Sequence, residues 1–347
     1  MPELRDLGQL FMAGFHGCSL APDHWLIRAL GEDNLGGVIL FDRNVDGSVQ
    51  NIRSPDQVRE LIGQLQEAAQ TPLCVAVDQE GGRVCRFKER DGFLPSRSAA
   101  ELAALGVAAT AAQSEALAAE LAGLGVNLNF APVVDLDLNP DNPVIGGYQR
   151  SFGALPEVVC AHAQAVIKAH HRYGVGCCLK HFPGHGSSGA DSHLGIVDCT
   201  DQWQACELAP YRLLLAQGYA DGIMTAHIIN RRLDPTGKPA TMSRAIITDL
   251  LRGELGFTGV VFSDDLQMQA ITQGLSYTKA VQEAVLAGVD VLVVGNNLAP
   301  RDDAVETGIR AVTELLDSGQ VSPRAVHRSL ARIAHFKQHL AGAFPWN

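Results

Sequence analysis

In Gly176-Cys-Cys-Leu-Lys-His181, a short apolar run ends in two polar side chains. A run that is apolar on both faces is typical of a strand buried on both sides, as in a parallel sheet. Similar runs recur along the chain and alternate with helix-like stretches. This alternation predicts an α/β protein, a single (β/α)8 TIM-like barrel with extra terminal helices, rather than a doubly wound sheet.

The expected elements are spread over the whole chain. The eight expected strands are Gln9–Phe15, Gly36–Phe41, Leu73–Val77, Asn127–Val134, Gly176–Leu179, Gly222–Thr225, Gly259–Phe262 and Val289–Val294. The expected helices are Pro55–Ala69, Pro156–Tyr173, Trp203–Gln217, Tyr277–Ala287 and Arg301–Leu316, with Ser322–Leu340 packed on the outside. Because no linker rich in proline, glycine or serine divides the chain, we expect one domain over residues 1–347.

Polar side chains stand where five successive strands end. In chain order they are Asp78, Asp135, Lys180 with His181, His227 and Asp264. Barrel active sites are built at the carboxyl ends of the strands. One polar residue there could be accidental, but five positions around one rim predict a functional site.

Composition excludes several kinds of partner. The chain has 27 lysines and arginines against 38 acidic residues, a formal net charge of −11, so it is a poor match for nucleic acid. Eight scattered cysteines without a Cys-x-x-Cys pair indicate free thiols in a reducing compartment. The N-terminus has no secretion signal pattern, and carboxylates interrupt the alanine-rich stretch Ala99–Val126. We therefore expect Ala99–Val126 to form a helix outside the membrane, and the protein to be cytoplasmic.

The segment from Lys180 to His193 carries the densest group of chemically active side chains. It could be a surface loop with incidental histidines, or a metal site from His181, His185, Asp191 and His193, although no His-x-x-x-His pattern on a helix supports metal binding. Its glycines match a dinucleotide fingerprint only by chance, because no helix pattern follows them. A fourth interpretation is an acid/base pair, since an extended backbone puts Asp191 and His193 on one side.

The nucleophile that an acid/base pair of Asp191 and His193 would need is expected at the end of the seventh strand. Asp264 leaves that strand directly and points toward the mouth of the predicted barrel. Its neighbour Asp265 is better explained as a helix cap or a rim charge. The polar cluster Asp78–Arg86 can bind sugar hydroxyls bidentately or form a loop ion pair, and Arg150 could act with it. His227 is as well explained by a structural role.

Together these segments resemble glycoside hydrolase family 3, in its single-domain β-N-acetylglucosaminidase branch. The matching stretches are Gly8–Gly14, Asp78–Arg86, Asn142–Gly153, Lys180–His193, Met224–His227 and Ser263–Met268. Lys-His-Phe-Pro-Gly-His-Gly followed by Asp-Ser-His is specific to this branch, whereas other members use a glutamate from an additional domain. The spacer from Ile145 to Arg150 is a residue or two longer than usual.

The resemblance implies a role for each matching residue. Asp264 is the expected nucleophile, His193 the acid/base and Asp191 its partner. The residues expected to hold the sugar are Asp78, Arg86, Arg150, Lys180 and His181. The branch implies cell-wall fragments carrying N-acetylglucosaminyl-anhydromuramyl groups as the small carbohydrate substrate. We expect a retaining mechanism, no metal or other cofactor, and a monomer.

Other functions stay open at this point. A neutral imidazole repels phosphate less than a carboxylate does, so phosphorolysis to a sugar 1-phosphate is the nearest alternative. A metal-dependent barrel hydrolase could use the three histidines of the Lys180–His193 segment. A sugar-binding barrel without turnover is a third alternative, which both candidate catalytic groups argue against.

Overall fold

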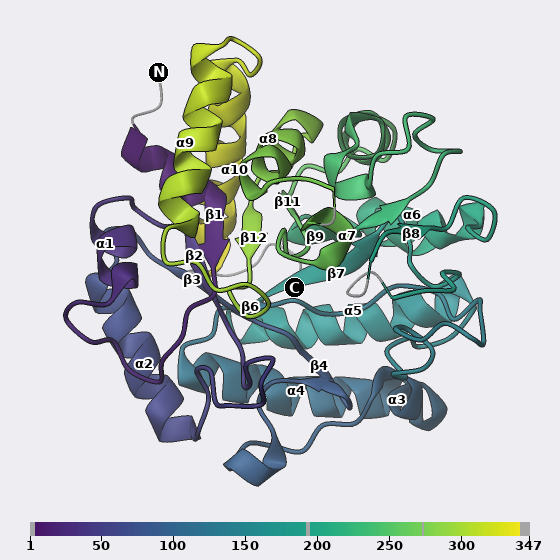
Figure 1. The fold of residues 1–347 in the computed structure, drawn as a ribbon. Helices are drawn as coiled ribbons and strands as arrows, with labels where there is room; N and C mark the ends of the chain where they lie inside the picture. Colours follow the sequence, from purple (N-terminus) through teal and green to yellow (C-terminus); the bar gives the residue numbers. More distant parts are fainter. Residues whose placement is uncertain (1–3, 192–194, 273, 341–347) are drawn as a thin grey trace.

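A computed structural model describes residues 4–191, 195–272 and 274–340, and its core is a ring of parallel strands (Figure 1). The strands are β1 (Phe11–Ala13), β2 (Gly37–Leu40), β3 (Cys74–Val77), β6 (Leu128–Asn129), β7 (Gly176–Phe182), β9 (Gly222–Thr225), β11 (Val260–Phe262) and β12 (Leu292–Val294). Each pairs in parallel with the next, and β12 pairs with β1. A parallel bridge from Phe262 to Val291 closes the ring. The predicted (β/α)8 barrel is confirmed.

Helices surround this ring (Figure 1). They are α1 (Trp25–Gly31), α2 (Pro55–Ala68), α3 (Ala99–Leu105), α4 (Val107–Leu124), α5 (Pro156–Arg172), α6 (Ala209–Ala216), α7 (Gln269–Thr272), α8 (Tyr277–Ala287), α9 (Ala304–Asp317) and α10 (Pro323–Leu340). A wider, π-type helix spans Ala245–Glu254 between β9 and β11. Local sequence sets where several helices begin: Ser54 caps α2 ahead of Pro55, and Ser276 caps α8.

The alanine-rich stretch forms two helices rather than one. Gly106, with φ of +91°, separates α3 from α4, a backbone conformation that favours glycine. Ser98 and Glu101 form a capping box at the start of α3, and α4 packs against α2 and α5. Of the helices in the described ranges, none has the length and apolar character needed to cross a bilayer.

Two strands differ most from the prediction at their carboxyl ends. β6 ends at Asn129, Pro132 follows without a backbone N–H to donate, and pairing with β7 continues beyond it only as an isolated parallel bridge between Val133 and Lys180. In contrast, β7 continues through Lys180 and His181 to Phe182, so the two polar residues belong to the strand itself. Their side chains are therefore held by the barrel and not by a loop.

The amino-terminal end of the barrel is covered by the last helix. Phe336 of α10 packs edge-on against Phe262 of β11, with ring centroids 6.1 Å apart, and Phe262 in turn meets Phe130 at 5.5 Å. α9 packs against β1, and α10 packs against the helical turn Leu4–Leu10, so the first and last described segments lie side by side (Figure 1). The candidate site lies at the carboxyl end of the barrel, opposite the end that α10 covers.

Candidate active site

A cavity of about 360 Å³ opens at the carboxyl ends of the barrel strands. Strand ends and the loops that follow them supply its polar lining, as expected for a barrel of this type. Six of the eight residues singled out from the sequence line it together: Asp78, Arg86, Arg150, Lys180, His181 and Asp264. These positions are up to 186 residues apart in sequence, so the fold brings them together.

Lys180 lies at the floor of this cavity and is only 2% exposed. Its Nζ donates to Asp78 Oδ1 at 2.7 Å and lies 2.6 Å from Glu80 Oε1. Burial lowers the pKa of Lys180, but the two carboxylates outweigh it, so the pKa rises above its ordinary value. The ammonium group is therefore charged and fixed in place.

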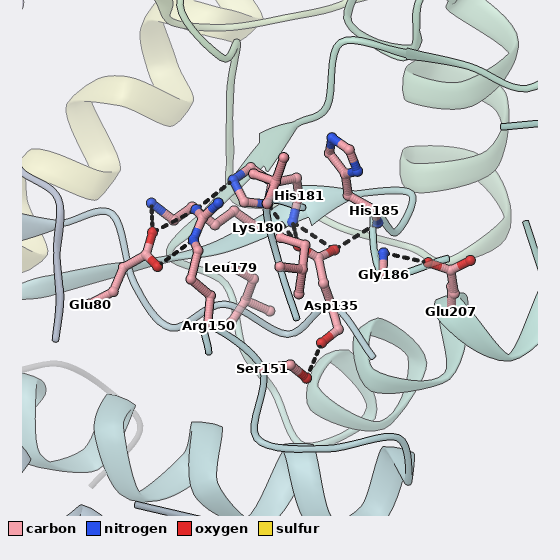
Figure 2. Close-up of polar contacts among 12 residues, drawn as sticks. Glu80, Asp135, Arg150, Ser151, Leu179, Lys180, His181, His185, Gly186 and Glu207 are labelled. Atoms are coloured by element: carbon pink, nitrogen blue, oxygen red, sulfur yellow. Dashed lines mark hydrogen bonds and ion pairs between the residues drawn. The ribbon is translucent and has the colours of Figure 1, made fainter. Parts of the chain in front are cut away.

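Arg150 is bound at two points by Glu80. Its Nε and Nη2 donate to the two carboxylate oxygens of Glu80, each at 2.8 Å (Figure 2). Burial raises the pKa of Glu80, but Arg150 and Lys180 outweigh burial and lower it to about 2. The segment from Ile145 to Arg150 folds into turns, including a bond from Arg150 N to Ile145 O at 2.9 Å, and the Arg150 side chain lines the cavity.

His181 connects Arg150 to a buried carboxylate. Its Nδ1 lies 2.7 Å from Asp135 Oδ2, and its Nε2 lies 3.2 Å from Arg150 Nη2 (Figure 2). A guanidinium group can only donate, so Nε2 accepts and the ring proton sits on Nδ1, directed at Asp135. Asp135 is 1% exposed. It thus fixes the tautomer and orientation of His181.

Arg86 occupies the outer part of the same charged network. Its Nη2 lies 3.5 Å from Asp78 Oδ2 and its Nη1 lies 3.9 Å from Asp42 Oδ1. Lys88 also donates to Asp42, at 2.5 Å. Arg86 is held between two carboxylates without a short bond to either, which leaves its donors usable by a ligand.

The two aspartates after β11 have different surroundings. Asp264 lies at the edge of the cavity, and one of its carboxylate oxygens accepts the backbone N–H of Asp265 at 2.8 Å. Asp265 accepts the N–H groups of Gln267 and Gly295, each at 3.0 Å, and so ties the end of β11 to the end of β12. These two contacts indicate a structural role for Asp265.

His227 also has a structural environment. Its Nδ1 lies 2.8 Å from Thr241 Oγ1 and its Nε2 lies 2.9 Å from the carbonyl oxygen of Asp265. His227 is 1% exposed and is not among the described residues that line the cavity. These bonds favour the structural explanation weighed for it from the sequence.

The loop after β7 is anchored by two buried carboxylates. Asp135 accepts the N–H of His185 at 2.9 Å, and Glu207 accepts the N–H of Gly186 at 2.9 Å (Figure 2). Glu207 also accepts the Ser187 hydroxyl at 2.5 Å. Burial raises the pKa of Glu207. Residues 183–188 are buried, and exposure begins only at Gly189. The first half of the loop is thus part of the packed structure.

Close packing explains the glycines of this loop. A Cβ added to Gly186 would lie 1.7 Å from the carbonyl oxygen of Leu136, and one added to Gly184, whose φ is +117°, would lie 2.5 Å from Glu207 Cβ. Neither position admits a side chain. Close packing therefore explains Gly184 and Gly186, two of the three glycines in the pattern that matches a dinucleotide fingerprint.

The acid/base candidate His193 lies outside the described residues. Asp191 is described, is partly buried, and is not among the described residues that line the cavity. His185, the third histidine of the segment, is buried, and burial lowers its pKa to about 4. No three His, Cys, Asp or Glu side chains in the described part of the chain are arranged to hold a metal ion.

Sequence reasoning missed Glu80, which contacts both cationic residues at the cavity floor. A signal was present, because Asp78 and Glu80 are two positions apart in an extended segment and so point to the same side. The role of Asp135 was also missed, although its place at a strand end was noted. At the outer wall, Arg83 lies over the ring of Tyr148, 3.8 Å from its centroid.

Known proteins resemble this chain along most of its length. The family model described as "Glycosyl hydrolase family 3 N terminal domain" matches residues 5–336. A protein from Tolumonas auensis named Beta-hexosaminidase is 40% identical over 295 residues, which is 83% of this chain and 83% of that protein.

Solved structures match the fold as well. A glycoside hydrolase family 3 β-N-acetylglucosaminidase from Paenibacillus sp. superposes with a TM-score of 0.87 at 34% identity; the match covers 98% of this chain and 63% of that one. This chain thus spans less than two thirds of that protein. A β-N-acetylhexosaminidase from Beutenbergia cavernae gives a TM-score of 0.85 at 30% identity, covering 97% and 99% of the two chains.

Proposed function

The chain belongs to glycoside hydrolase family 3 and is a glycoside hydrolase, and from this premise we propose that it is a retaining exo-β-N-acetylglucosaminidase. One observation carries the proposal. Asp264, at the end of β11, lines the same cavity as a compact group of cations and carboxylates suited to a sugar's hydroxyls. Relatives named β-hexosaminidase and β-N-acetylglucosaminidase support the sugar class.

In the first step, Asp264 attacks the anomeric carbon as the bond to the leaving oxygen breaks. A covalent glycosyl-aspartate forms, and His193 supplies the proton that the leaving oxygen takes up. In the second step, water attacks the same carbon, its proton passes to His193 and Asp264 is released, with β configuration retained. Asp191, two residues before His193, is the proposed partner that supports the imidazolium.

The remaining cavity residues hold the sugar. Lys180 and Arg150 are fixed cations, because Glu80 binds both, and they present N–H donors to ring hydroxyls. Asp78 and Arg86 flank Lys180 and offer an acceptor and a donor at neighbouring positions. His181 holds the Arg150 side chain in position through the 3.2 Å contact between His181 Nε2 and Arg150 Nη2. A sugar thus meets a preorganised surface with little reorganisation.

The natural substrate that we propose is an N-acetylglucosaminyl-anhydromuramyl (peptide) fragment of peptidoglycan, met during recycling. Arg43, Arg83 and Arg86 line the cavity and supply positive charge for the carboxylates of such an aglycone. The enzyme is proposed to work as one catalytic barrel over residues 1–347, as a monomer without a cofactor. All eight cysteines are free thiols, which supports a cytoplasmic location.

Trapping the intermediate tests this proposal. The protein is incubated with a 5-fluoro N-acetylglucosaminyl fluoride, digested, and analysed by mass spectrometry. The expected result is a single glycosylated peptide, modified at Asp264. A label on another carboxylate, or turnover of the reagent through an oxazoline without any protein adduct, would remove Asp264 as the nucleophile.

A further inference from the structure

A second large cavity lies at the opposite end of the barrel from Asp264. It measures about 570 Å³ and lies between the π-type helix Ala245–Glu254 and α10. Asp290 forms part of its lining and precedes β12, whereas the active-site residues follow their strands. We call this cavity the arginine cleft, after its residues Arg244, Arg252, Arg328 and Arg332.

The arginines come from two facing walls. Arg244 and Arg252 are eight residues apart, with Thr248 between them lining the same cleft, so they share one face of the π-type helix and its start. Arg328 and Arg332 are four residues apart on α10 and so also share a face. Each wall therefore presents two guanidinium groups to the space between.

Charge in the cleft is unbalanced. Of the described residues that line it, only Asp290 is acidic, so four guanidinium groups meet one carboxylate and the net charge is +3. The chain as a whole carries −11. Like charges brought together in a partly buried space repel each other unless an anion compensates them.

Ion pairs within the described protein explain the positions of only two of these four arginines. Asp290 is 1% exposed, accepts from Arg252 and from Arg332 Nη2 (2.6 Å), and also holds the N–H of Val261 at 2.9 Å. The deep pair thus secures the start of β12 against β11. Arg244 and Arg328 are exposed at the mouth, and neither forms an ion pair with any residue that the structure describes.

A further donor in the deep part of the cleft lacks an acceptor. Within the described chain, Arg252 Nε is buried and has no hydrogen-bond partner, although Nη1 of the same side chain donates to the carbonyl of Phe257 at 3.0 Å. Buried donors are normally paired, because an unmade hydrogen bond costs about 1–3 kcal/mol in general. The donors of the Arg252 guanidinium are therefore only partly satisfied by Asp290 and the backbone carbonyl groups.

We propose that the arginine cleft binds a small anion with two or more phosphoryl groups. Planar guanidinium groups match the spacing of phosphoryl oxygens and can each donate two bonds to them. The cleft is much larger than one simple ion needs, and its arginines stand on opposite walls, so a ligand with charge at both ends fits better than orthophosphate. The ligand does not compete with the substrate, which lies at the other end of the barrel.

Calorimetric titration with inorganic pyrophosphate tests the proposal, using the wild-type protein and the double variant R244Q/R328Q. Both changed residues lie at the mouth and hold no element together, so the fold is expected to survive. The control is R53Q/R324Q, which removes the same charge from exposed arginines outside the cleft. Tripolyphosphate, orthophosphate and a poly-glutamate peptide complete the series.

The expected result is one saturable pyrophosphate site, weakened at least about tenfold in R244Q/R328Q and changed by less than about twofold in the control. No saturable binding up to about 10 mM, or equal weakening in both variants, overturns the proposal. Binding of poly-glutamate as tightly as pyrophosphate overturns it in favour of an acidic peptide. Hydrolysis of an aryl N-acetylglucosaminide, measured alongside, is expected to be the same in all three proteins.

Discussion

Glu80 and Arg150 form a buried ion pair with two parallel hydrogen bonds, Nε to Oε2 and Nη2 to Oε1, each 2.8 Å long. The same Glu80 carboxylate lies 2.6 Å from Lys180 Nζ, so one acidic group fixes two cations from different parts of the barrel. Glu80 thus organises the cavity floor. Its loss is expected to affect both the fold and substrate binding.

Glu80→Gln is expected to destabilise the protein by about 3 kcal/mol or more, because two buried cations lose their shared carboxylate. It is also expected to raise KM, since Arg150 and Lys180 lose their fixed positions. Urea unfolding and steady-state kinetics measure the two effects. The control is Glu254→Gln, which breaks an exposed pair with Arg212 and is expected to cost less than about 1 kcal/mol. Equal costs for the two variants would contradict the role of Glu80.

The stability provided by Glu80 is expected to depend on pH. Its pKa falls from the ordinary value of 4.5 to about 2 in the folded protein, because Arg150 and Lys180 outweigh burial. A lowered folded-state pKa contributes stability that is complete above 4.5 and is lost as the pH falls toward 2. The difference in unfolding free energy between wild type and Glu80→Gln should therefore shrink over this range. A difference that stays constant from pH 6 to about 3 would show that the pair does not ionise as described.

Asp264→Asn is expected to lower kcat by about three orders of magnitude or more while the protein folds normally, because the nucleophile is lost. Azide added to this variant should restore turnover of an activated aryl glycoside and give the glycosyl azide of inverted configuration. Asp265→Asn is the matched control. It replaces the carboxylate that accepts two backbone N–H groups by an amide, whose oxygen is a weaker acceptor, so it should lower thermal stability more than turnover. Near-normal turnover by Asp264→Asn would end its assignment.

The repeating pattern of the sequence was sufficient to predict the barrel, since all eight strands and the main helices lie where apolar runs and helical periods indicated. The prediction for α8, Tyr277–Ala287, agrees at both ends. Two of the differences lie where one residue changes the backbone: Gly106 divides the alanine-rich helix, and Pro132 interrupts the strand predicted as Asn127–Val134. Such breaks depend on tertiary packing, which periodicity does not contain.

The candidate site was predictable only in part. Strand ends placed Asp78, Lys180 and Asp264 together without reference to any contact. Glu80 and Asp135 were harder to find because their partners, Arg150 and His181, are 70 and 46 residues away in sequence. A buried carboxylate that orients other side chains looks, in sequence, like any loop acid.

His193→Ala is expected to lose about 10²- to 10⁴-fold in kcat/KM on substrates with poor leaving groups, which need a proton as they depart. Aryl glycosides with acidic phenols need little protonation, so their loss should be far smaller. A series of aryl N-acetylglucosaminides gives the slope of rate against leaving-group pKa for wild type and variant. The slope measured for Asp191→Asn should lie between the slopes of wild type and His193→Ala. The same slope in His193→Ala as in wild type would exclude His193 as the general acid.

Gly186→Ala is expected to disturb the start of the loop that carries Asp191, because the added Cβ would lie 1.7 Å from the carbonyl oxygen of Leu136, a backbone atom that cannot move aside alone. Overpacking of this kind costs about 1–3 kcal/mol. The shift should also break the bond from Gly186 N to Glu207 and so reduce turnover of poor leaving groups most.

Gly189→Ala is the matched control in the same loop. Its Cβ would meet only Asn139 Nδ2, at 4.0 Å, which is ordinary contact distance. This variant is expected to keep stability within about 0.5 kcal/mol of wild type and to keep its leaving-group dependence. If the two alanine variants behave alike in unfolding and in the aryl glycoside series, close packing at Gly186 does not set the position of the loop, and the anchoring by Asp135 and Glu207 must be sufficient without it.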